Sequence, residues 1–231
     1  PTALAAGLAG GTIGGLVGLG GGVVMVPMLT NFANLAQHAA VGTSSAAVVL
    51  TASTGALAFA SAGAVDWNAA ATLAVAAMVG ARFGARFTSS FSSAQLARTF
   101  AIFQLCVAPI VPIKGELARR AKRGAGEGVA AVADTQPQRR NYVALMGVGL
   151  FAGISSGMFG IGGGLIITPT LCLTTDMDYK QVLGTNLASM VPPAVVSAVT
   201  HYGLGNLVMA AAPALCLGAA IGGTAGGQLA Q

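Results

Sequence analysis

The sequence predicts an all-α membrane protein, a polytopic helical bundle of two homologous repeats that contains helices broken at glycine. Three observations lead to this fold class. The chain has only 11 Lys or Arg and 6 Asp or Glu among 231 residues, whereas 55% of its residues are apolar and its mean hydropathy is +0.77. Its apolar residues form long runs, and a glycine-rich motif in the first run recurs later in the chain. Because soluble domains carry about 25% charged residues, most of this protein's surface must face lipid.

The apolar runs predict helices rather than strands. They lack continuous period-2 alternation and are longer than the membrane barrel strands of about 10 residues. A membrane-spanning helix needs about 20 apolar residues, so we expect about seven spans, from runs at residues 3–30, 41–63, 69–88, 98–113, 142–172, 182–204 and 207–229.

The recurring motif indicates an internal duplication. Residues 18–27 (GLGGGVVMVP) return 142 positions later as residues 160–169 (GIGGGLIITP). The same offset, without a gap, pairs Gly42 with Gly184, Thr43 with Thr185, Gly63 with Gly205, Gly80 with Gly222 and Gly84 with Gly226. We therefore expect a first transmembrane repeat at 1–113, a basic extramembrane linker at 114–140 and a second repeat at 141–231. The partner of run 98–113 would fall beyond Gln231, so we expect about eight spans in the full-length protein.

The basic residues give two conflicting indications of membrane orientation. Seven of the eleven Lys and Arg residues lie at 114–140, and the positive-inside rule places such a segment in the cytoplasm. Arg82, Arg86 and Arg98 would flank the opposite membrane face if every run crossed once. The orientation therefore stays open unless a broken run fails to cross completely.

The two glycine triplets, residues 20–22 and 162–164, predict helix breaks. Each glycine costs about 1 kcal/mol of helix propensity relative to alanine. Run 3–30 would be about 42 Å long as one straight helix, whereas the hydrocarbon core is about 30 Å thick. Broken helices at matching positions of two repeats are typical of a transporter's binding site; an unbroken, tilted helix is the alternative. Glycines at four-residue spacing, as in Gly7, Gly11 and Gly15, predict close helix packing.

Polar residues follow each triplet at equivalent positions and suggest an anion site. Thr43 and Ser44, and likewise Thr185 and Asn186, are expected to open a helix, where such side chains cap free N–H groups. The same helix starts, with positive dipole ends, could instead offer donors to an anion without a costly buried cation. The candidate substrate-binding residues are Gly20, Gly21, Gly22, Thr43, Ser44, Gly162, Gly163, Gly164, Thr185 and Asn186.

His201 is a candidate proton-coupling group, since histidine titrates near neutral pH; an interfacial anchor beside Tyr202 is the alternative. The sequence does not match the common enzyme motifs. Val23 and Leu165 stand where GxGxxG needs its third glycine, and GxxxxGK[ST] and HExxH do not occur. We therefore expect no catalytic residues and no cofactor. Cys106, Cys172 and Cys216 are interpreted as packing residues, with no metal site or disulfide.

The order and doubling of these motifs resemble the sulfite exporter TauE/SafE family, also called the toluene-sulfonate uptake permeases. The matching segments are residues 15–22 with Pro27, 40–44, 63–67, 80–84, 160–164 with Pro169, 183–186 and 218–226. The resemblance implies a multi-pass inner-membrane carrier of roughly eight spans that moves sulfite, sulfonates or related sulfur-containing anions.

These observations together predict a secondary transporter with alternating access and a site between the two repeats. Its expected partners are a small anionic solute and the lipid bilayer, with no nucleic acid, and a homo-oligomer is left open. The alternatives are a transporter or passive channel for another small solute and a membrane scaffold that moves nothing.

Overall fold

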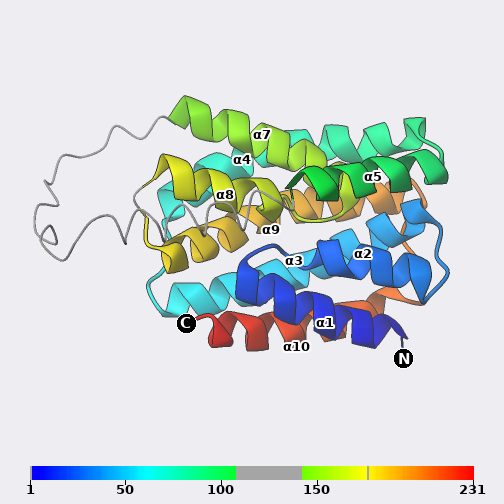
Figure 1. Cartoon of the computed structure of the whole chain (residues 1–231), viewed down its shortest axis with the longest axis horizontal. Coiled ribbons are helices and arrows are strands. Elements are labelled where there is room, and N and C mark those ends of the chain that lie inside the picture. The colour runs from blue at the N-terminus through cyan, green and yellow to red at the C-terminus, as the bar shows by residue number, and fades with distance from the viewer. Residues whose placement is uncertain (1, 108–141, 176) are drawn as a thin grey trace, which may run out of the picture.

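The structure is a computed structural model that describes residues 2–107, 142–175 and 177–231. These residues form nine α-helices and one short 3-10 turn, without a strand among them (Figure 1). The predicted linker at 114–140 and the end of run 98–113 lie outside the described residues. The helices are α1 (Thr2–Val17), α2 (Gly22–Asn31), α3 (Gln37–Ser61), α4 (Trp67–Phe87), α5 (Ser93–Val107), α7 (Tyr142–Phe159), α8 (Gly164–Thr174), α9 (Tyr179–Gly203) and α10 (Ala212–Leu229), and the 3-10 turn is η1 (Thr88–Ser90).

The predicted helix break is present in the first run, where α1 ends at Val17 and α2 begins at Gly22. Between them Gly18, Gly20 and Gly21 have φ angles of 71°, 74° and 83°, which glycine adopts without the steric cost that a Cβ would impose. The chain then reverses, and α2 runs back along α1 (Figure 1). Each broken run is therefore a helical hairpin rather than one long crossing.

The second run repeats this geometry. Gly160, Gly162 and Gly163 have φ angles of 67°, 82° and 78° between the end of α7 and the start of α8. Other helix ends also lie 142 positions apart: α3 and α9 begin at Gln37 and Tyr179. The local backbone conformation of the motif is thus the same at both places.

Helices α3 and α9 cross the centre of the bundle in opposite directions. The hydroxyls of Ser45 and Ser197 are 3.1 Å apart, while ten residues farther along α3 Gly55 faces Leu187, ten residues earlier in α9. The two hairpins accordingly enter from opposite ends of the bundle, and their broken tips meet near its middle (Figure 1). Among the described residues, three helices are long and apolar enough to cross a membrane: α3, α9 and α4 continued through η1.

Close glycine packing joins helices that are distant in the sequence. Helix α1 lies along α10, and α7 lies along α4. A Cβ added to Gly11 would stand 2.6 Å from the carbonyl oxygen of Ala219, and one on Gly149 would stand 2.6 Å from that of Leu73. These glycines let the helix backbones touch, as the four-residue spacing predicts.

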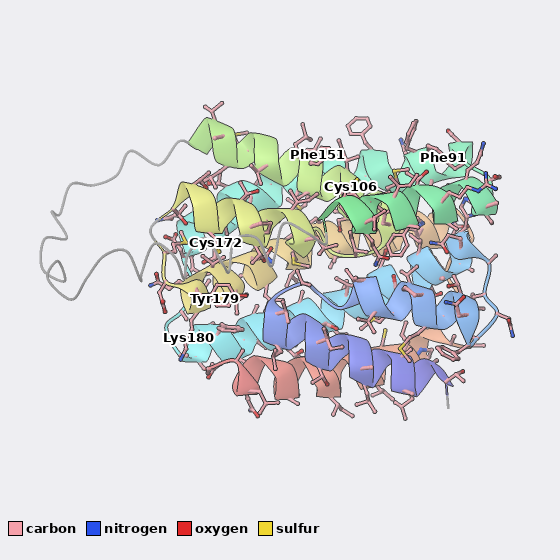
Figure 2. All side chains as sticks on the ribbon, viewed as in Figure 1. Phe91, Cys106, Phe151, Cys172, Tyr179 and Lys180 are labelled. Atoms are coloured by element: carbon pink, nitrogen blue, oxygen red, sulfur yellow. The ribbon has the colours of Figure 1, made fainter. Side chains whose placement is uncertain are left out.

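Large apolar side chains cover the outside of the bundle (Figure 2). Phe83, Phe151 and Val199 are 66%, 59% and 64% exposed. Water would make such a surface unfavourable over so much of a protein. A lipid environment accounts for it, in agreement with the low charge content of the sequence.

Candidate functional site

The two helix breaks contact each other through their backbones. A Cβ added to Gly164 would stand 2.6 Å from the carbonyl oxygen of Gly18 and 2.9 Å from the Cα of Leu19. A Cβ on Gly22 would overlap the carbonyl oxygen of Gly160 and stand 2.7 Å from the Cα of Ile161. The fold thus brings together two segments that are 142 residues apart, and only glycine leaves room for this approach.

The starts of α2 and α8 are buried and carry no side-chain cap. Their N-cap residues are Gly21 and Gly163, neither of which has a side chain to accept from the first N–H groups. All six residues of the two triplets are buried. No side chain of residues 2–107, 142–175 or 177–231 accepts a hydrogen bond from these helix starts. Such donors, at the positive ends of two helix dipoles, favour an anion.

The carbonyl ends of the same breaks are capped, and each cap comes from the opposite half. Ser44 Oγ donates to the carbonyl oxygen of Gly160 at 2.9 Å. Asn186 Nδ2 donates to the carbonyl oxygen of Gly18 at 2.5 Å and to Thr168 Oγ1 at 2.7 Å. Two carbonyl acceptors at the breaks are thereby bonded, whereas the helix starts at Gly22 and Gly164 have no side-chain cap.

Two apolar side chains close the space between the triplets. The terminal methyl of Met190 lies against both Gly20 and Gly162, where a Cβ on either would overlap it. Val48 Cγ1 would be 3.3 Å and 2.9 Å from those same Cβ positions. Both side chains are fully buried. The sequence analysis did not include Val48 and Met190 in the site. The sequence did contain a signal for them, because they are 142 positions apart and each lies one helical turn after Ser44 or Asn186.

Thr43 and Thr185 lie inside helices, so the prediction that they open helices is wrong. Helix α3 already begins at Gln37 and α9 at Tyr179, since a threonine hydroxyl can bond a carbonyl of the preceding turn and be accommodated within a helix. Thr43 Oγ1 donates to Ala39 and accepts from the N–H of Val208 at 3.1 Å.

Thr185 makes the corresponding contact in the other half. Its Oγ1 accepts from the N–H of Asp66 at 2.9 Å. Each threonine therefore holds the connection between the two long helices of the opposite half, α9 to α10 or α3 to α4. Of the four predicted polar side chains, the structure brings Ser44 and Asn186 to the glycine breaks and turns Thr43 and Thr185 toward these connections.

His201 is completely buried rather than exposed at a helix end. Its Nε2 is 2.9 Å from the carbonyl oxygen of Gly157, in the last turn of α7, and its Nδ1 is 3.4 Å from Asn206 Nδ2. A carbonyl only accepts, so Nε2 carries the proton and Nδ1 accepts from the amide. The ring therefore bonds the helix that ends at the second break.

Residues 3–231 match the family model described as sulfite exporter TauE/SafE. A probable membrane transporter protein of Bacillus subtilis, YunE, is 27% identical over 96% of this chain and 85% of its own length. A probable membrane transporter protein of Xylella fastidiosa is 28% identical over 78% of this chain and 67% of its own length. One of Haemophilus influenzae is 41% identical over 36% of this chain and 35% of its own length. No solved structure matches the chain.

Proposed function

Because the chain belongs to the sulfite exporter TauE/SafE family, we propose that it is a secondary transporter of small sulfur-containing oxyanions such as sulfite or a sulfonate. Relatives named as probable membrane transporter proteins support the transport function. We place the protein in the inner membrane as a multi-pass carrier. Its partners are then the anion and the lipid bilayer.

The observation that supports the site best is the pair of uncapped helix starts at the centre of the bundle. The buried N–H groups at Gly22 and Gly164 lie at the positive ends of two helix dipoles, and neither helix start has a side-chain cap. Helix starts of this kind bind anions, and broken helices supply them in secondary transporters. Of the helices that meet here, α1, α2, α3, α7 and α8 contain no Asp, Glu, Lys or Arg, and α9 contains only Lys180, in its first turn.

Alternating access would follow from two repeats of inverted topology. The recurrence of helix ends and break conformations at one offset supports a duplicated architecture. The hairpin α1–α2 reaches the centre from one end of the bundle and α7–α8 from the other (Figure 1). Rocking one repeat against the other would open the same central site to each side in turn. In this proposal the hairpins α1–α2 and α7–α8 each enter the membrane and turn back at its middle. Helices α3, α4 and α9 cross it completely.

A carrier fits the centre better than a passive channel does. Val48 and Met190 fill the space between the two triplets, so a solute reaches the helix starts only after these side chains move. In a channel for another small solute, or in a scaffold that transports nothing, the buried and uncapped N–H groups at the starts of α2 and α8 would have no anion to bind.

The test is flux into proteoliposomes that contain the purified chain. Radiolabelled sulfite, sulfate, thiosulfate and taurine would be supplied with and without a pH gradient. We expect uptake of at least one sulfur oxyanion that saturates with concentration. Flux of none of them would remove the substrate proposal, while flux that neither saturates nor responds to a gradient would favour a channel.

His201 is the proposed proton-coupling group of this carrier. Replacing it by phenylalanine, the residue at the equivalent position 59, keeps the volume of an aromatic ring but removes its titratable nitrogens. We expect the His201→Phe protein to transport without stimulation by a pH gradient. Unchanged stimulation would assign coupling to another group.

A further inference from the structure

Asn186 breaks the symmetry between the two helix breaks. Its equivalent in the first half is Ser44, and both side chains are fully buried. The Ser44 hydroxyl bonds the carbonyls of Val41 and Gly160. The Asn186 amide carries an additional atom, the carbonyl oxygen Oδ1, which has no hydrogen-bond partner. Within residues 2–107, 142–175 and 177–231, the one other buried side-chain polar atom in this condition is Gln37 Nε2.

The amide that carries the unpartnered oxygen lies beside the uncapped start of α8. Asn186 Nδ2, bonded to the same carbon as Oδ1, is 3.0 Å from the position that a Cβ on Gly164 would take. Its bonds to Gly18 and Thr168 fix the amide orientation. Exchanging Oδ1 and Nδ2 would place an oxygen against the Gly18 carbonyl, where both groups only accept. Oδ1 is therefore held as an acceptor at this helix start.

An acceptor among donors restricts which anion can be satisfied there. Anionic oxygens would accept from the N–H groups that begin α8. An oxyanion without a proton would also place a lone pair against Oδ1, leaving that buried acceptor unbonded and repelled. A ligand that carries both anionic oxygens and one O–H or N–H group would satisfy the helix start and Oδ1 together.

Resting on the proposed function, we propose that Asn186 Oδ1 accepts a hydrogen bond from the transported anion. The site then prefers sulfur oxyanions that present a hydrogen-bond donor, such as hydrogen sulfite or a sulfonate with a hydroxyl group on its neighbouring carbon. The first half, with Ser44 at the equivalent place, has no amide carbonyl oxygen there, and the Ser44 hydroxyl is already engaged as a donor. Asn186 is thus the residue that sets this preference.

Two sulfonates of equal charge and equal size test the preference directly. Hydroxymethanesulfonate carries an O–H donor, and ethanesulfonate has a methyl group at the same place. Their binding to the purified full chain in detergent would be measured by calorimetry at one pH, in sodium and in potassium buffer. We expect hydroxymethanesulfonate to bind about tenfold to a hundredfold more tightly, because ethanesulfonate would leave the buried Oδ1 without a hydrogen-bond partner.

The matched variant is Asn186→Ser. By analogy with Ser44 and Gly160, a serine at 186 retains a donor for the Gly18 carbonyl but lacks Oδ1. We expect the variant to bind the two sulfonates with nearly equal affinity. Thermal unfolding of the variant would establish that it is folded.

The outcomes separate this inference from the proposed function. Equal binding of the two sulfonates by the wild-type protein would overturn the inference and leave the anion site standing. A preference for hydroxymethanesulfonate that persists in Asn186→Ser would also overturn the inference. So would equal binding of the two sulfonates in sodium buffer with no binding in potassium buffer, because Oδ1 would then hold a sodium ion. If neither sulfonate nor sulfite nor sulfate binds, the anion site itself is wrong and the inference falls with it.

Discussion

At Gly22 and Gly164 a single hydrogen in place of a side chain decides whether the two halves can meet. Both residues begin helices and have ordinary helical backbone, so alanine is conformationally acceptable at either position. The obstacle is the opposing backbone, which a Cβ would overlap. Gly20, Gly21 and their equivalents differ, because their positive φ angles are what reverse the chain.

The first prediction isolates this backbone contact. Gly22→Ala should lower the free energy of unfolding by about 1–3 kcal/mol, because a rigid backbone must move to admit the methyl group, and should sharply reduce flux. Gly147→Ala is the control: Gly147 is also helical, but nothing lies within 4 Å of its Cβ position, so alanine should stabilise by about 0.5–1 kcal/mol. Thermal unfolding in detergent compares the two. Equal stability would mean that the breaks do not touch.

The second prediction concerns Met190, which lies between Gly20 and Gly162. Met190→Val would give this position the residue found at its equivalent, Val48, and would remove part of the closing side chain. We expect flux of larger sulfonates to rise about tenfold relative to sulfite, the size of effect that a methylene or two has in an apolar pocket. Met146→Val is the control, since Met146 is 49% exposed on α7. The same selectivity in both variants would exclude Met190 from the pathway.

At the scale of elements, hydrogen bonds between the halves hold the short connections of the long helices. The N–H of Asp66, at the start of α4, donates to Thr185 in α9. The N–H of Val208, just before α10, donates to Thr43 in α3. The hydroxyls are thus engaged by protein, and we predict that they serve the assembly of the bundle rather than direct contact with the solute.

The third prediction follows from these contacts. Thr185→Val leaves the N–H of Asp66 without the acceptor that it has in this structure, at a cost of about 1–3 kcal/mol in the free energy of unfolding, while the apparent affinity for the anion stays unchanged. Thr224→Val is the control, because Thr224 is exposed and its hydroxyl bonds only carbonyls of its own helix; its effect should stay within about 0.5 kcal/mol. Loss of anion affinity in Thr185→Val would return Thr185 to the binding site.

At the scale of the whole molecule, the antiparallel crossing of α3 and α9 determines how the halves relate. Helices pack mainly across the halves, with α1 on α10 and α7 on α4. The equivalent ends of α3 and α9 therefore lie at opposite ends of the bundle. Ala36 and Asp178, the N-cap residues of these two helices, are both exposed.

The fourth prediction uses this pair of equivalent positions. In a protein with Cys106, Cys172 and Cys216 replaced by serine, Ala36→Cys and Asp178→Cys should react with a membrane-impermeant maleimide from opposite sides of the membrane. Intact cells and inverted vesicles supply the two sides. Labelling of both from one side would contradict the inverted arrangement and the access scheme that depends on it.

The sequence by itself determined where the helices break and which positions are equivalent. Glycine triplets in apolar runs are poor helix formers whatever surrounds them, so residues 20–22 and 162–164 could be found without a structure. The scarcity of charge likewise required a lipid-facing surface. The sequence is sufficient for these conclusions because each depends only on neighbouring residues, on the repeat at an offset of 142 or on composition.

Only the tertiary structure decided what the breaks contact. Equivalence at an offset of 142 does not make two residues neighbours: Ser44 bonds Gly160, and Asn186 bonds Gly18, because α3 and α9 cross in opposite directions. The reversal at each break, the closure by Val48 and Met190, and the unpartnered oxygen of Asn186 all depend on packing between segments more than a hundred residues apart. Such contacts are set by the relative orientation of whole helices, which no local pattern specifies.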